Sequence, residues 1–437
     1  MAYRYSKILW IGAYLAAILA PLFILLLGDH TPPTSFWWDF AIALGFSVAA
    51  MMGIMFFLTA RFRRVSAPFG IDLIYYFHRQ IALVAFFLMV LHPLILIGVE
   101  PLILEYLKPD APKHMLAGTA AFVCVCLLIV SSVLRKQLGI NYETWRTVHA
   151  ILAVVTIILV MFHIIGVKYY VASSWKSTFW ISFALFWLAL LVYVRLIKPI
   201  IMLKRPYYID KIIEEQGNAN TLVIKPKDHT GLSFLPGQFI WLTLWHSPFS
   251  LNEHPFSISS SAVQSGSFSV TIKALGDFTS EINTVQPGEP VYIDGPYGAF
   301  SVDRYPKQNY AFIAGGIGIA PIMSMLRTLS DRSDQRPLIL FYCYKSLEYM
   351  TFYQELEALR KSLNIRVIYV LSDPDVSWTG ECGYLDCKIL EKYLPANKTT
   401  YDYFICGPIP MMASTEKMLH RLGIPLTQTH SEIFNLV

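Results

Sequence analysis

Hydrophobic and polar positions divide this chain into two parts. Long apolar runs dominate the first ~200 residues, and six of them are long enough to cross a hydrocarbon core of about 30 Å as helices. They cover residues 8–27, 36–58, 72–98, 115–134, 147–166 and 177–198. From about residue 205 onward the pattern is that of an ordinary soluble protein. We therefore expect a membrane α-helical bundle of six transmembrane helices over 1–204, followed by a soluble part.

The soluble part changes its own pattern near its middle. Over 205–305, short alternating strands are separated by turns that contain Gly and Pro, which predicts an antiparallel β-barrel. Over 306–437, compact apolar runs alternate with helical stretches, which predicts an α/β domain with a parallel sheet. The chain should thus hold three domains, with boundaries near residues 204 and 305.

Charge then orients the bundle. Only 15% of residues are charged, against about 25% in soluble domains. The net charge of +5 is modest, and basic clusters such as Arg135 and Lys136 flank the apolar runs, which favours a role in topology over nucleic-acid binding. These clusters fall in alternate connecting segments. With the basic segments inside, both termini and the soluble domains face the cytoplasm, and the plasma (inner) membrane is the expected location.

Four histidines lie inside the apolar runs with one repeated spacing. His78 and His92 are fourteen residues apart, and so are His149 and His163. Fourteen residues return to nearly the same helix face after a rise of about 21 Å. In the predicted topology the two helices run in the same direction, so His78 faces His149 on the inner side and His92 faces His163 on the outer side. The alternative is that each histidine bonds only to a neighbouring helix; the repeated spacing favours two bis-histidine sites for two b-type haems.

Small residues near these histidines add weak support for a haem site. Ala85 and Thr156 lie halfway along the two histidine faces, where small residues would let a flat macrocycle approach. An ordinary helix interface also favours small residues. For the outer propionates the sequence offers Lys113, His114 and Lys168.

A glycine loop opens the α/β domain. Gly315, Gly316 and Gly318 lie between a predicted strand and the helix that contains Pro321. Such a loop lets backbone amides and a helix N-terminus approach a pyrophosphate. The spacing is not the full dinucleotide fingerprint, so a simple structural turn is the alternative. Lys345 follows the second strand, where a partner for the 2′-phosphate of NADPH would lie; this favours NADPH over NADH.

Several further motifs occur in a recognisable order. They are His254-Pro255-Phe256-Ser257-Ile258-Ser259, Lys273 with Gly276-Asp277-Phe278-Thr279, and Cys406-Gly407-Pro408. Together with Phe77-His78-Arg79 and the segment 142–149, they resemble the NADPH oxidase and ferric reductase family. In that family a ferric reductase-like membrane domain is fused to a ferredoxin–NADP reductase-like module, and the prokaryotic-type NADPH oxidases are the most similar members.

The resemblance implies roles for these motifs. The first two would bind FAD, and the glycine loop with Cys406-Gly407-Pro408 would bind the nicotinamide nucleotide, with Cys406 and Phe434 at the site of hydride transfer. Two departures stand out. Soluble members usually have Arg where His254 stands, and they often end in the aromatic residue that stacks on flavin, whereas Phe434 is followed by three more residues. Lys273 and the amides of Gly276–Thr279 are the candidates to compensate at the pyrophosphate.

The implied function is transmembrane electron transfer. Electrons would pass from cytoplasmic NAD(P)H through FAD and the two haems to an acceptor on the far side of the lipid bilayer. O2, reduced to superoxide as a reactive oxygen species, is favoured slightly over an Fe(III) chelate. A third possibility is a haem subunit that serves a partner reductase. Because both donor domains lie on this chain, no protein activator is expected.

Overall fold

The computed structural model describes residues 2–27, 35–62, 71–264 and 266–432. The chain separates into two compact units. One, which we call the helical unit, contains Met1–Pro68 and Leu73–Pro199. The other, the sheet unit, contains Phe69–Asp72 and Ile200–Val437.

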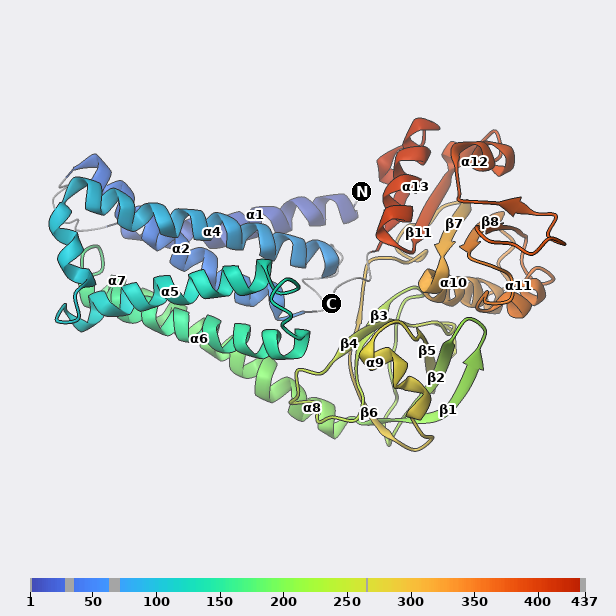
Figure 1. The fold of residues 1–437 in the computed structure, drawn as a ribbon, viewed down its shortest axis with the longest axis horizontal. Coiled ribbons are helices and arrows are strands. Elements are labelled where there is room, and N and C mark those ends of the chain that lie inside the picture. Colours follow the sequence, from blue (N-terminus) through green and yellow to red (C-terminus); the bar gives the residue numbers. More distant parts are fainter. Residues whose placement is uncertain (1, 28–34, 63–70, 265, 433–437) are drawn as a thin grey trace. The chain divides into compact units, whose positions relative to one another are not determined.

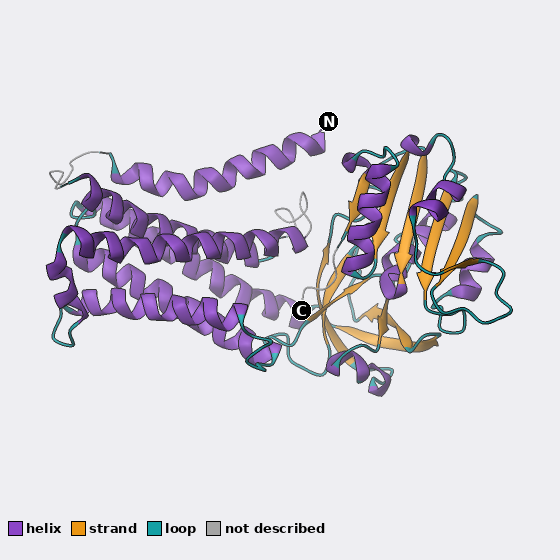
Figure 2. Ribbon diagram, turned by 45° about the horizontal axis from the view of Figure 1, so that its top comes forward, coloured by secondary structure: helices purple, strands orange, loops and turns teal. Residues whose placement is uncertain are grey.

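The helical unit is a bundle of long helices that lie side by side (Figures 1 and 2). The helices are α1 (Ala2–Leu25), α2 (Phe36–Thr59), α4 (Ile71–Val99), α5 (Lys113–Val133), α6 (Tyr142–Val167) and α7 (Ser174–Val192), with a 3-10 helix η1 (Pro101–Leu107) between α4 and α5. Within the described residues, five helices are long and apolar enough to cross a membrane: α2, α4, α5, α6 and α7 with its continuation. The apolar stretch of α1 is shorter, Ile11–Leu25, so the sixth predicted span is not confirmed.

Two helix boundaries differ from the sequence prediction for one physical reason. α6 begins at Tyr142, although the apolar run begins only near residue 147, and α7 continues through a π-helical turn (η2, Tyr193–Ile197) into α8 (Lys198–Lys204). Hydropathy marks the apolar part of a helix, whereas backbone hydrogen bonding continues into its polar flanks. The polar turn at the start of α6 and the basic turn at the end of α8 are therefore helical as well.

The first sheet of the sheet unit is antiparallel. Its strands are β1 (Tyr207–Glu215), β2 (Ala219–Pro226), β3 (Phe239–Thr243), β4 (His254–Ser257), β5 (Phe268–Lys273) and β6 (Pro290–Tyr297). Their order is β4-β3-β6-β1-β2-β5. A bridge between Ile258 and Val270, with the Ser259 amide donating to the Ser269 carbonyl at 2.8 Å, joins the two ends of this order. The short helix α9 (Asp277–Ser280) and the 3-10 turn η3 (Ile282–Thr284) follow β5.

The second sheet is parallel, as the alternation of strand and helix predicted. Its strands are β7 (Asn309–Gly315), β8 (Leu338–Tyr344), β9 (Ile365–Leu371), β10 (Glu381–Cys382), β11 (Tyr401–Cys406) and β12 (Thr429–Ser431). Their order is β10-β9-β8-β7-β11-β12. Strands β8, β9 and β10 lie on one side of β7, and the later strands β11 and β12 lie on the other. The strand order therefore reverses between β7 and β11.

Helices cover both faces of the parallel sheet (Figure 2). α10 (Ile319–Asp331) and α11 (Tyr353–Leu359) pack into the hydrophobic core on one face. α12 (Cys387–Tyr393) and α13 (Ile409–Arg421) pack into the core on the other face. The 3-10 turns η4 (Gly316–Gly318), η5 (Lys398–Thr400) and η6 (Leu426–Gln428) complete this layer.

Helix α10 also connects the two sheets. The Ser324 hydroxyl donates to the Ser260 carbonyl at 2.7 Å, and the Ala262 amide donates to the Thr328 hydroxyl at 2.9 Å. The Arg327 guanidinium donates to the Ser259 carbonyl at 2.6 Å. The loop after β4 is therefore fixed by side chains of a helix that belongs to the other sheet.

Candidate cofactor-binding sites

The outer histidine pair is held by main-chain carbonyls of neighbouring helices. The Nδ1 atom of His92 on α4 lies 2.7 Å from the Ala41 carbonyl oxygen of α2, and Nδ1 of His163 on α6 lies 2.9 Å from the His114 carbonyl oxygen of α5. Because a carbonyl only accepts, each Nδ1 must carry the proton, which leaves the Nε2 lone pair available for a metal. Metal-binding histidines usually donate their other ring N–H in this way.

The inner histidine pair has the spacing of two axial ligands. The ring centroids of His78 and His149 are 6.4 Å apart, with an angle of 59° between the rings. Two imidazoles bound to one metal through bonds of about 2 Å hold their centres about 6 Å apart. The rings of His78 and His149 therefore lie at a separation that two imidazoles on one metal would have, and the assignment of the four histidines to two metal sites stays a prediction.

The residues present would fit a haem. Each pair would supply two imidazole nitrogens, the kind of protein ligand that haem iron takes. Among the described residues, no group of three or more His, Cys, Asp and Glu side chains is placed to hold a metal ion. Ala85 and Thr156 are buried, in keeping with their predicted place between the histidine positions.

Sequence reasoning missed two glycines beside the outer pair. A Cβ atom on Gly118 would lie 2.7 Å from Nδ1 of His163, and one on Gly45 would lie 3.1 Å from Cε1 of His92. Each glycine follows, by four residues, the residue of its own helix whose carbonyl accepts the hydrogen bond from the histidine; the two histidines come from other helices, so this relation is visible only once the helices are packed.

The two predicted flavin motifs meet in the structure. The His254 ring stacks on the Phe278 ring with centroids 3.9 Å apart, and Phe256 lies 6.0 Å from Phe278 on a nearly parallel plane. Pro255 is partly exposed beside them, whereas Ser257 and Ile258 are buried. Ser259 is fully buried, and its hydroxyl accepts a hydrogen bond from Thr271 at 2.8 Å.

The candidates for the pyrophosphate are already engaged. Lys273 Nζ donates to the Tyr344 hydroxyl at 2.8 Å and lies over the Tyr344 ring. The Thr279 hydroxyl accepts from the amides of Leu275 and Gly276, at 2.9 Å each. Asp277 begins α9. A bound pyrophosphate would therefore compete with contacts inside the protein for Lys273 and for the Gly276 amide.

The glycine loop and the Cys406-Gly407-Pro408 segment lie together. They follow β7 and β11, which are paired along their length. A Cβ atom on Gly318 would lie 2.3 Å from the Cys406 carbonyl oxygen, and one on Gly407 would lie 3.0 Å from the Cα of Gly315. In open α/β sheets, ligands bind beyond the carboxyl ends of the strands where the strand order reverses. The loop that holds Gly315, Gly316 and Gly318, followed by Pro321 in the first turn of α10, occupies this position.

Cys406 is fully buried at this edge. Burial, and then the charge of Glu432, raises the pKa of its thiol well above the ordinary range, so the thiol is protonated at neutral pH. Glu432 is itself buried, and its carboxylate would lie 2.8 Å from a Cβ atom on Gly298 of the first sheet. Sequence reasoning missed Glu432, whose only sequence signal is its place two residues before Phe434. Phe434 lies outside the described residues.

Lys345 is exposed at the end of β8. Its Nζ lies 3.8 Å from an Asp373 carboxylate oxygen, and both side chains are 73% exposed. The contact leaves Lys345 accessible to a ligand, and its role with a 2′-phosphate stays a prediction.

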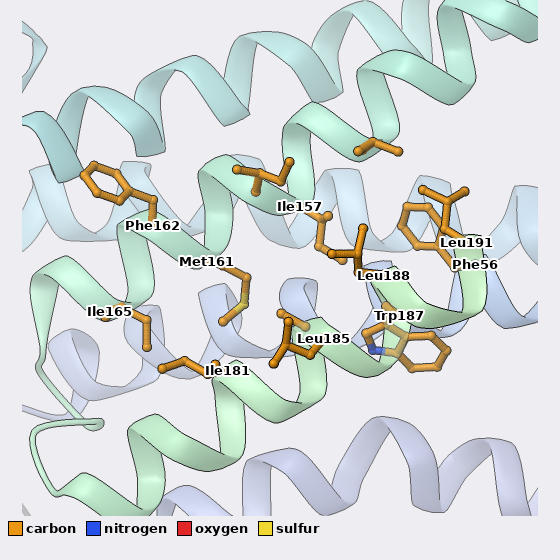
Figure 3. Close-up of a pocket in the computed structure, with 13 residues that line it drawn as sticks. Phe56, Ile157, Met161, Phe162, Ile165, Ile181, Leu185, Trp187, Leu188 and Leu191 are labelled. Atoms are coloured by element: carbon orange, nitrogen blue, oxygen red, sulfur yellow. The ribbon is translucent and has the colours of Figure 1, made fainter. Parts of the chain in front are cut away.

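Two cavities lie away from these sites. One, of about 380 Å³, lies between α6 and α7, and among the described residues only apolar and aromatic side chains line it, including Phe56, Met161 and Leu188 (Figure 3). The other, of about 370 Å³, lies at the amino ends of β8, β9 and β11, beside Arg366 and Lys392. The first offers no charged group to a nucleotide, and the second lies at the edge of the sheet opposite the glycine loop.

Comparisons with protein families agree with this arrangement. Residues 44–161 match the ferric reductase like transmembrane component, residues 214–301 an FAD-binding domain, and residues 312–417 an oxidoreductase NAD-binding domain.

Two curated relatives illustrate the similarity to single proteins, each over about half of the chain. The glycine betaine monooxygenase reductase subunit of Pseudomonas aeruginosa (strain UCBPP-PA14) is 27% identical over 234 residues, which are 51% of this chain and 62% of that protein. Flavohemoprotein A of Dictyostelium discoideum is 27% identical over 246 residues, 53% of this chain and 60% of that protein. The chain thus spans less than two thirds of either relative.

Among solved structures, the FAD/NAD-binding domain of nitric oxide dioxygenase from Vibrio cholerae O1 biovar El Tor is similar, with a TM-score of 0.47 and 22% identity over 52% of this chain and 97% of that one. The three family matches follow one another along the chain in the order of the helical unit, the antiparallel sheet and the parallel sheet. The chain therefore has the ferric reductase/NADPH oxidase-type architecture, in which a ferric reductase-like transmembrane component is followed by an FAD-binding and an NAD-binding domain.

Proposed function

We propose that this protein transfers electrons from cytoplasmic NAD(P)H, by way of FAD and two b-type haems, to O2 on the far side of the membrane, where superoxide forms. The observation that carries the proposal is the pair of facing histidines with ring centroids 6.4 Å apart, repeated fourteen residues along both helices, on a chain that has its own flavin and nucleotide domains. Flavin takes up two electrons as hydride and releases them singly, as haem requires.

The histidines would set how the acceptor reacts. His78 with His149, and His92 with His163, would hold the two haems as imidazole donors. With two protein donors for each iron, the acceptor would take its electron from the outer site without binding to the metal. The protein would contribute ligands, fixed positions and an apolar surrounding.

The sheet unit would bind the donor side. We propose that the first sheet closes into a β-barrel through the Ile258–Val270 bridge. The segments 254–259 and 276–279 would hold FAD, and the loops after β7 and β11 would hold the nucleotide, with Lys345 at the 2′-phosphate. Phe434 and Cys406 would border the nicotinamide; the Cys406 thiol, being neutral, would act by contact or hydrogen bonding and not as a thiolate.

The proposed topology completes this route. Six spans would place both termini and the domains over 205–305 and 306–437 in the cytoplasm, in the plasma (inner) membrane. With donor and acceptor sites on one chain, turnover would require no protein activator.

An Fe(III) chelate is the second candidate acceptor. The match of residues 44–161 to the ferric reductase like transmembrane component favours it, and the same four histidines would serve. Electron delivery to a partner reductase is the third candidate.

One experiment separates the first two. The purified protein, given FAD and NADPH, is assayed for cytochrome c reduction that superoxide dismutase suppresses, and separately for Fe(III)-chelate reduction under argon. Our proposal expects the first signal, with His163→Ala lacking it and His420→Ala, an exposed histidine of α13, retaining it. Chelate reduction under argon without any dismutase-sensitive signal would identify a ferric reductase instead.

A further inference from the structure

The two outer histidines contact their neighbouring helices in the same way. On α2, the carbonyl of Ala41 accepts from His92, and Gly45, four residues later, lies against the same ring. On α5, the carbonyl of His114 accepts from His163, and Gly118, again four residues later, lies against that ring. We call a carbonyl at position i with glycine at i+4 a glycine notch.

Helix geometry explains why glycine stands at i+4. Cα–Cβ bonds in an α-helix tilt toward the N-terminus, so the side chain at i+4 covers the turn that contains the carbonyl of residue i. Glycine at i+4 leaves that carbonyl open to a second donor from another helix. It also leaves room for the donor's ring, which any Cβ atom at Gly118 would approach to 2.7 Å.

Near His163, α5 and α6 are also in close contact. A Cβ atom on Gly166 of α6 would lie 2.2 Å from the Cβ of His114. The backbone of α5 therefore reaches the His163 ring because glycines on both helices permit it.

We propose that Gly45 and Gly118 are positioning residues for the outer haem: through the two notches, α2 and α5 fix the ring planes and the Nδ1–H tautomer of His92 and His163. This inference rests on the proposed di-haem function. The orientation of His92 and His163 would thus be set by α2 and α5, two helices that carry no haem ligand themselves.

His149 of the inner pair provides the contrast. Nδ1 of His149 lies 3.4 Å from the hydroxyl oxygen of Ser132, which itself donates to the Leu128 carbonyl at 2.5 Å. A 3.4 Å contact is long for a hydrogen bond. Donation from Nδ1 to a carbonyl makes the imidazole a stronger base toward the metal, which favours the oxidised iron. The notches therefore lower the reduction potential of the outer haem relative to the same site without them.

Gly118→Ala and Gly45→Ala test the notches. The control is Gly12→Ala on α1, where a Cβ atom would meet nothing within 4 Å. The measurements are haem content by pyridine haemochrome, the low-spin electron paramagnetic resonance signals, a redox titration and FAD content. For Gly118→Ala we expect loss of one haem, or an altered low-spin signal with an upward shift of the outer potential. Gly45→Ala should change the same signals less, because its contact is longer.

The outcomes are distinct. Two haems with wild-type signals and potentials in both variants would overturn the notch proposal. A wild-type protein with fewer than two haems would overturn the proposed function itself. If Gly118→Ala failed to fold, as aggregation on size-exclusion chromatography in detergent would report, the milder Gly45→Ala would decide: unchanged spectra and potentials there would overturn the notch proposal.

Discussion

The helical unit and the sheet unit offer cofactors different parts of the chain. In the helical unit, the candidate ligands are side chains, His78, His92, His149 and His163, and the backbone serves only to orient them. In the sheet unit, the candidate nucleotide site is made of backbone, where the loops after β7 and β11 approach too closely for a Cβ atom at Gly318. The histidine site should therefore be lost when a side chain is removed, whereas the nucleotide site should be lost when a Cβ atom is added.

The largest effect should follow removal of a histidine. His92→Ala or His163→Ala should abolish binding of the outer haem, and His78→Ala or His149→Ala binding of the inner one, because a six-coordinate site loses an axial ligand. Pyridine haemochrome should fall from two haems per chain to one, while FAD binding by the sheet unit is unchanged. His420→Ala is the control. Unchanged haem content in all four variants would mean that the histidines only bond neighbouring helices.

Adding a single atom tests the other side of the comparison. In Gly318→Ala the new Cβ would lie 2.3 Å from the Cys406 carbonyl oxygen, a backbone atom that has little freedom to move. Overpacking of this kind costs about 1–3 kcal/mol, so we expect the KM for NAD(P)H to rise by roughly tenfold. Haem content should stay at the wild-type value. An unchanged KM would place the nucleotide elsewhere.

The contacts of α10 with the first sheet can be tested through Arg327. Its guanidinium donates to the Ser259 carbonyl and to both carboxylate oxygens of Glu355. Arg327→Ala leaves a buried carbonyl without this donor, and we expect a loss of about 1–3 kcal/mol in the stability of the sheet unit, with weaker FAD binding. Arg360→Ala, which removes an exposed pair with Glu357, should cost at most about 1 kcal/mol. Thermal unfolding followed by flavin release compares the two variants; equal effects would contradict the prediction.

A substitution at Phe434 tests whether a side chain of the sheet unit also contributes to the flavin and nicotinamide site. If its ring stacks on the flavin, the ring occupies the place of the nicotinamide, and Phe434→Ala should lower the KM for NAD(P)H by up to about tenfold, since such stacking contributes about 0.5–1.5 kcal/mol. The preference for NADPH over NADH should relax and FAD should bind less tightly. Steady-state kinetics with both nucleotides measure this. Unchanged KM values together with lower thermal stability would mean that the ring packs in the core.

The smallest expected effect concerns alkylation of Cys406, which should not occur in the native protein. Burial raises the pKa of the Cys406 thiol well above its ordinary range and that of Cys343 to about 12. Because a raised pKa keeps a thiol protonated as pH rises, iodoacetamide at pH 7–9 should leave both unmodified in the native protein. Cys382, which is exposed, should be alkylated. Mass spectrometry of the labelled protein distinguishes them, and rapid labelling of Cys406 would show that the edge of the sheet opens.

The sequence alone was sufficient to predict features that depend on local periodicity. Apolar runs predicted the five long helices, and the alternation of strand and helix predicted the parallel sheet, because the patterns of helices and strands follow from 3.6- and 2-residue repeats. The fourteen-residue spacing placed two histidines on one face of α4 and two on one face of α6. Apolar runs predicted helix ends poorly where a helix extends beyond its apolar residues. α6 begins before its apolar run, and the apolar stretch of α1 is too short to confirm a sixth span.

Contacts between distant residues were decided by the tertiary structure. That the Ala41 carbonyl meets His92, 51 residues away, depends on how α2 packs on α4. That Lys273 meets Tyr344, 71 residues away, depends on how the two sheets join. The place where the strand order reverses depends on which side of β7 receives β11. A repeat fixes the direction of a side chain on its own element, whereas its partner is chosen by the packing of elements far apart in the chain.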